Sequence, residues 1–113
     1  ATTINGKTVC ANIASTSATS VLSNSSGSNK VLKVNTVNVS NYSSTSVPVM
    51  VYYTATDGST KHSIVGGLSV PAYSTLSAID KSSQYYLEEN TNIGVIAGTG
   101  GALSVSISYE DIS

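Results

Sequence analysis

Apolar and polar residues alternate along most of this chain with the two-residue period of a β-strand. In the clearest stretch, Val47 to Ala55, every second residue is apolar, and Pro48 stands near the beginning, where a missing backbone donor is tolerated. Helical spacing of apolar residues nowhere extends beyond a single turn. The pattern therefore predicts an all-β protein.

Turn-forming residues divide the chain at short, regular intervals, which is typical of a sandwich or barrel. The segments between them predict eight or nine strands, over residues 7–14, 19–23, 30–40, 47–55, 60–65, 74–79, 84–87, 92–97 and 103–109. Two packed antiparallel sheets bury one face of each such strand. We expect an antiparallel β-sandwich of about eight strands, with a small β-barrel as the alternative.

Residues 30–40 require a change of phase within one strand. Leu32 and Val34 share one face while Val37 and Val39 share the other, so strict alternation would leave one pair in water. One extra residue near Asn35-Thr36 would restore the phase. The sequence predicts a β-bulge there.

Glycine positions predict the turns. Asp57-Gly58 between two alternating runs is a strong signal for a hairpin with a two-residue turn. Gly66-Gly67 is expected to break the second strand of this hairpin after Val65. Gly98-Thr99-Gly100-Gly101 is expected to form a glycine-rich hairpin loop before the last strand.

The composition is rich in hydroxyl groups and poor in charge, with 22 Ser, 13 Thr, no Arg and a net charge of −1 in 113 residues. Without clustered Arg or Lys, nucleic acid is not an expected partner. The longest apolar runs are too short to cross a bilayer, so a membrane is not expected either. A charge near zero does little to keep copies apart, which favours self-association.

The length predicts one β domain over residues 1–113. The first 28 residues contain few cohesive apolar pieces, so 1–28 are interpreted as a partly extended N-terminal arm that orders against a neighbour.

Residues with catalytic or ligand-binding chemistry are scarce. The single cysteine, Cys10, lies in an apolar alternation and is interpreted as a packed thiol, with an intermolecular disulfide or a reactive thiol as the alternative. The one histidine, His62, has no partner at metal-ligand spacing, and the adjacent acids Glu88-Glu89 and Glu110-Asp111 do not form an acid/base pair. We expect no enzyme activity, no catalytic residues, no metal and no cofactor.

The seven tyrosines are the largest apolar side chains in the chain. Tyr53 and Tyr109 are expected to anchor the core. Neighbouring residues of a strand point to opposite faces, so one member of each pair Tyr52-Tyr53 and Tyr85-Tyr86 must face outward. The candidate interface residues are three tyrosines and one residue near the end of the chain: Tyr52, Tyr85, Tyr86 and Ile112.

Several short motifs occur in a recognisable order between Lys30 and Ser113: Lys30-Val31-Leu32-Lys33-Val34, Val47 to Tyr53, Val70-Pro71-Ala72, Ile79-Asp80-Lys81, Tyr86-Leu87-Glu88-Glu89 and Ser108-Tyr109-Glu110-Asp111-Ile112-Ser113. In this order the chain resembles small virion structural proteins of tailed bacteriophages, in particular those that infect marine cyanobacteria. The resemblance does not extend to the first 29 residues.

The resemblance implies a non-enzymatic component of the virion that contacts phage capsid or tail proteins. A compact, nearly neutral β domain suits a head decoration, or cement, protein bound in many copies. A tail, baseplate or fibre component is the runner-up. A host-adhesion or carbohydrate-binding module with exposed tyrosines is the alternative from another class.

Overall fold

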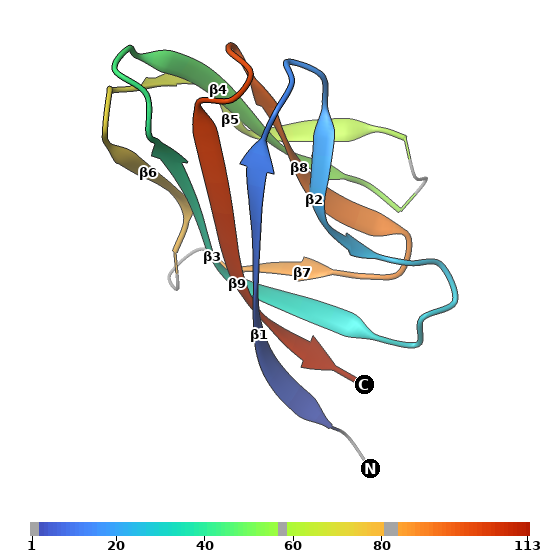
Figure 1. Cartoon of the computed structure of the whole chain (residues 1–113). Helices are drawn as coiled ribbons and strands as arrows, with labels where there is room; N and C mark the ends of the chain where they lie inside the picture. Colours follow the sequence, from blue (N-terminus) through green and yellow to red (C-terminus); the bar gives the residue numbers. More distant parts are fainter. Residues whose placement is uncertain (1–2, 57–58, 81–83) are drawn as a thin grey trace.

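A computed structural model of the chain describes residues 3–56, 59–80 and 84–113 as a sandwich of two antiparallel β-sheets (Figure 1). These described residues form nine strands: β1 (Ile4–Ile13), β2 (Thr19–Asn24), β3 (Val31–Asn41), β4 (Val47–Thr54), β5 (Lys61–Val70), β6 (Thr75–Ile79), β7 (Tyr85–Leu87), β8 (Thr91–Ala97) and β9 (Leu103–Ile112). The described residues form no helix, and so none that could span a membrane. The predicted all-β sandwich is confirmed, and the sheets do not close into the alternative barrel.

Both sheets are built from strands that are distant in the sequence. The five-stranded sheet has the order β1-β9-β3-β6, with β7 also paired to β3, and the four-stranded sheet has the order β2-β8-β4-β5. Only the β4–β5 and β6–β7 connections stay within one sheet, and every other connection crosses to the opposite one. This is the strand order of a jelly roll in which β6 and β7 share the place of one strand.

The core lies between the sheets and consists of the inward-facing residue of each alternating pair. From the five-stranded sheet it takes residues such as Val37, Val105 and Ile107, and from the four-stranded sheet residues such as Val51 and Ile93, all fully buried. Most of these residues are β-branched, which suits a pleated surface buried on one side.

The predicted bulge in β3 is present. The pairing of β3 with β9 shifts between Val34 and Thr36, which leaves Asn35 as the extra residue. As a result Leu32, Val34, Val37 and Val39 all face the core. The hydrophobic pattern had required this change of phase.

Two glycine predictions were wrong. Gly66 and Gly67 do not break a strand, because β5 continues through them as an edge strand with two shifts in its pairing to β4. The loop 98–101 is not a hairpin, because β8 and β9 belong to different sheets. The predicted β4–β5 hairpin is present, and its proposed turn residues, Asp57-Gly58, lie outside the described residues.

The N-terminal segment forms part of the sandwich, which corrects its interpretation as an arm. All ten residues of β1 pair with β9 without a register shift, and β2 pairs with β8. Beyond the strands, Thr3 and Ser113 exchange backbone hydrogen bonds of 2.8 and 2.9 Å, so the start of β1 and the end of β9 lie side by side (Figure 1). Edge-strand pairing supplies the order that apolar content alone did not predict.

A buried asparagine fixes each of two polar loops. The side-chain amide of Asn24, at the end of β2, donates to the carbonyl oxygens of Lys30 (2.8 Å) and Leu87 (2.9 Å). The amide of Asn41, at the end of β3, donates in the same way to Thr45 (2.8 Å) and Val70 (2.9 Å). Such bonds offset the cost of burying an amide and tie each loop to the opposite sheet.

Candidate functional site

Tyr52 was predicted to lie at an interface, and the structure shows that this was wrong. Its side chain points away from the core yet is only 3% exposed, because it lies across Gly94 of the neighbouring strand β8. The ammonium group of Lys61 covers the ring at 5.6 Å from the ring centroid. Burial raises the pKa of the Tyr52 hydroxyl. The missing side chain at Gly94 makes this burial possible on an outer face.

Tyr85, a second interface candidate, also faces inward. Its ring packs against that of Tyr53, with centroids 6.3 Å apart and planes tilted by 51°. Both rings are half-buried against the core, as is Tyr109. The expected anchoring role of Tyr53 and Tyr109 is confirmed, and Tyr85 joins them instead of contributing to a surface.

The other two candidates, Tyr86 and Ile112, lie on the outer face of the five-stranded sheet near the chain termini. Ile112 stands between Ile4 and Val31 in directly paired positions of three neighbouring strands. Tyr86, which is 54% exposed, pairs with Lys33 on the same face. Ile4 and Val31 are 61% and 38% exposed. We call these four residues the end cluster: Ile4, Val31, Tyr86 and Ile112.

Next to the end cluster, a row of paired residues carries the charges of Glu110 and Lys33, and the face beyond this row carries no charge. Three rows of paired residues cross it, and every member except Cys10 is Ser, Thr or Asn: Thr8, Ser108 and Thr36; Cys10, Ser106, Asn38 and Ser77; Asn12, Ser104, Ser40 and Thr75. These eleven residues are half-buried or exposed. We call them the hydroxyl face. In this part of the sheet the core thus lies on one side and a neutral, hydrogen-bonding surface on the other.

The structure corrects the interpretation of Cys10 as a packed thiol. Val9, Ala11 and Ile13 point toward the core, so Cys10 points outward, and its side chain is exposed. The alternation of β1 determines this orientation, because only every second side chain of a strand can face the core.

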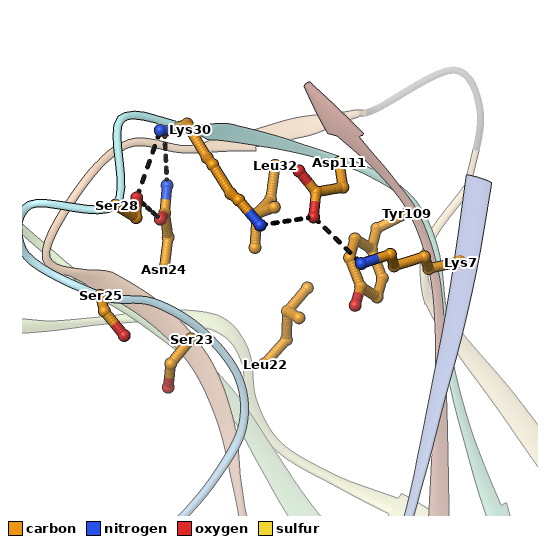
Figure 2. Close-up of a pocket in the computed structure, with 10 residues that line it drawn as sticks. All are labelled: Lys7, Leu22, Ser23, Asn24, Ser25, Ser28, Lys30, Leu32, Tyr109 and Asp111. Carbon is orange, nitrogen blue, oxygen red and sulfur yellow. Dashed lines mark hydrogen bonds and ion pairs between the residues drawn. The ribbon is translucent and has the colours of Figure 1, made fainter. Parts of the chain in front are cut away.

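A cavity of about 360 Å³ opens between β1 and β9 of one sheet and β2 of the other, beside the β2–β3 loop (Figure 2). Asp111, only 5% exposed, faces inward there, and its Oδ2 accepts hydrogen bonds from Lys30 (3.1 Å) and Lys7 (3.2 Å). Figure 2 shows that the two lysines approach the carboxylate from opposite sides. Leu22, Leu32 and Tyr109 supply apolar surface next to these charges.

The two lysines determine the ionisation of this carboxyl group. Their hydrogen bonds and positive charges hold the pKa of Asp111 below its usual value, although partial burial acts in the opposite direction. Asp111 is therefore a carboxylate at neutral pH. The cluster has one negative and two positive groups, so the cavity wall carries a single excess positive charge.

Within residues 3–56, 59–80 and 84–113, three or more His, Cys, Asp or Glu side chains nowhere gather as metal ligands would. Lys7, Lys30 and Asp111 form the only ion-pair cluster of the described residues. No protein-family model, no curated protein and no solved structure matches this chain.

Neither the hydroxyl face nor the Lys7–Asp111–Lys30 cluster was predicted from the sequence. The alternating Ser104, Ser106 and Ser108 were a signal for one strand of the face. Its other strands could not be placed beside this one without the order β1-β9-β3-β6. The cluster joins residues about a hundred positions apart, and only sheet pairing brings them together.

Proposed function

We propose that this chain is a non-enzymatic structural protein of a bacteriophage particle. Within that class we propose a head decoration protein that is present in many copies. The observation that carries the proposal is the outer face of the five-stranded sheet, which presents the neutral hydroxyl face and, beyond the Glu110–Lys33 row, the apolar end cluster. The order of motifs from Lys30 to Ser113 supports the phage assignment. Jelly-roll sandwiches are common in viral capsid proteins and in lectins, although a fold alone does not define a function.

The chemistry of this face suits protein–protein contact. Binding through charged side chains requires their desolvation, and the hydroxyl face has none to desolvate. Short hydroxyl and amide side chains can bond to a partner directly or through water. Tyr86 and the aliphatic residues of the end cluster supply the apolar anchor that such an interface needs.

The size of the face favours repeated contact. The face is four strands wide, with neighbouring strands about 4.8 Å apart, and nine residues long, at about 3.4 Å per residue. Its area is therefore on the order of 500 Å². A stable interface buries about 800 Å² on each partner. One such contact is therefore weak, and a lattice of many copies, or self-association of this chain, would strengthen it through multivalency.

The copy number of the chain in purified virions tests this proposal. Quantitative protein staining should find on the order of hundreds of copies per particle for a head decoration protein. A few to a few dozen copies would favour the runner-up, a tail, baseplate or fibre component. Absence of the chain from virions would overturn the proposal.

A further inference from the structure

We propose that the cavity between β1, β9 and β2 is a binding site for a neutral sugar unit. This inference does not rest on the proposed particle contact, because the cavity lies on the inner side of the five-stranded sheet and not on its outer face. It assigns a ligand chemistry to the Lys7–Asp111–Lys30 cluster.

Hydrogen-bonding groups remain available in the cavity. Both bonds from the lysines go to Oδ2 of Asp111, and Oδ1 accepts none from the described residues. Among these residues the Tyr109 hydroxyl likewise has no partner. No buried side-chain oxygen of the described chain lacks a partner, so both atoms are reachable by solvent. Each ammonium group has further N–H donors beyond the one that it gives to Asp111.

These groups form a mixed set of donors and acceptors beside an apolar wall. A sugar hydroxyl can donate to the Asp111 carboxylate and accept from Lys7 or Lys30, while the C–H face of the ring packs on Leu22, Leu32 and Tyr109. The volume of about 360 Å³ lies within the range of small-molecule sites. The cavity therefore complements both the polar edges and the apolar faces of a pyranose ring.

Charge favours a neutral ligand over an anion. An anion attracted to the two lysines would lie next to the Asp111 carboxylate, which already uses both of them. It would have to displace this carboxylate or bear its repulsion. A neutral polyol avoids this cost.

The wall of the cavity is held in place before a ligand arrives. Asn24 Nδ2 donates to the carbonyl oxygen of Lys30, at the far end of the β2–β3 loop, and to that of Leu87, at the end of β7. Asn24 Oδ1 accepts a hydrogen bond from the Ser28 hydroxyl (Figure 2). Gly27 N donates to Glu89 Oε1 at 2.7 Å. Such preorganisation lowers the entropic cost of binding.

Nuclear magnetic resonance titration of the chain with a panel of neutral monosaccharides tests the proposal. We expect at least one sugar to cause saturable changes in the backbone chemical shifts of Ser25, Ser28 and Asp111. The dissociation constant should be about 1 mM, as suits so small a ligand. Tyr109→Phe keeps the ring and removes one hydrogen bond, so binding should weaken by about 3- to 10-fold. Tyr73→Phe, at an exposed loop tyrosine, is the matched control and should bind as the parent does.

Three results would overturn the site: no saturable shift with any sugar, equal affinity of Tyr109→Phe and the parent, or binding only of inorganic phosphate or acetate in parallel titrations. A fourth, sugar-dependent shifts confined to Tyr42 and Tyr73, would transfer binding to the loops and also reject the cavity. None of these results depends on the copy number of the chain in virions, so the sugar site and the proposed particle role can each fail without the other.

Discussion

Tyr52 and Gly94 are directly paired across β4 and β8, and the ring of Tyr52 occupies the space that a side chain at position 94 would need. A Cβ atom there would overlap Oη of Tyr52 and lie 2.6 Å from the carbonyl oxygen of Thr19. Tyr52 is buried on an outer face for this reason.

Gly94→Ala should therefore destabilise the fold by about 1–3 kcal/mol, since the added methyl group forces the ring or β2 to move. Urea denaturation measures the change. Gly6→Ala is the control, because its Cβ would meet nothing within 4 Å. Equal stability of Gly94→Ala and Gly6→Ala would contradict the described packing.

The Asp111 carboxylate should make stability depend on acid pH. Its pKa is lowered in the folded state, so the protonated form favours unfolding. The contribution is complete well above the unfolded value of 3.8 and is lost as the pH falls through the lower, folded value. In acid titrations of the melting temperature, Asp111→Asn should lack this part of the pH dependence. Identical pH profiles of variant and parent would show that the ion pairs do not form.

Cys10 should react with a thiol reagent in the native protein at a rate close to that of a small free thiol, because its side chain is exposed on β1. Absorbance of the released chromophore measures the rate. A reaction that requires denaturant would instead restore the interpretation as a packed thiol.

Local pattern was sufficient for the positions of the strands, apart from the extension of β5 through Gly66 and Gly67, and for the bulge at Asn35, since each depends on which neighbouring residues must face the core. It was not sufficient for the partners of each strand. Gly98 to Gly101 read as a hairpin loop because their composition fits one, yet the loop joins the two sheets. Gly101 N donates to the carbonyl oxygen of Ile13, a contact 88 residues away that no local pattern contains.

The interface candidates show the same limit. Alternation correctly required Tyr52 and Tyr53 to point to opposite faces, but an outward direction did not mean exposure once Gly94 provided room for the ring. Tyr86 and Ile112 are brought to one face because β3 pairs with both β7 and β9. The sequence identified residues of the end cluster and did not reveal that they are neighbours.

Incorporation of a charged variant into virions is the most direct test of the outer face as the contact surface. Ser106→Lys places a charge at the centre of the hydroxyl face, and Ser63→Lys places the same charge at an exposed position of β5 in the other sheet. Both should keep the melting temperature of the parent, because neither side chain faces the core. We expect Ser106→Lys to be depleted at least about tenfold from purified particles, the equivalent of about 1.4 kcal/mol, while Ser63→Lys assembles as the parent does. Equal incorporation of the two folded variants would contradict the central claim.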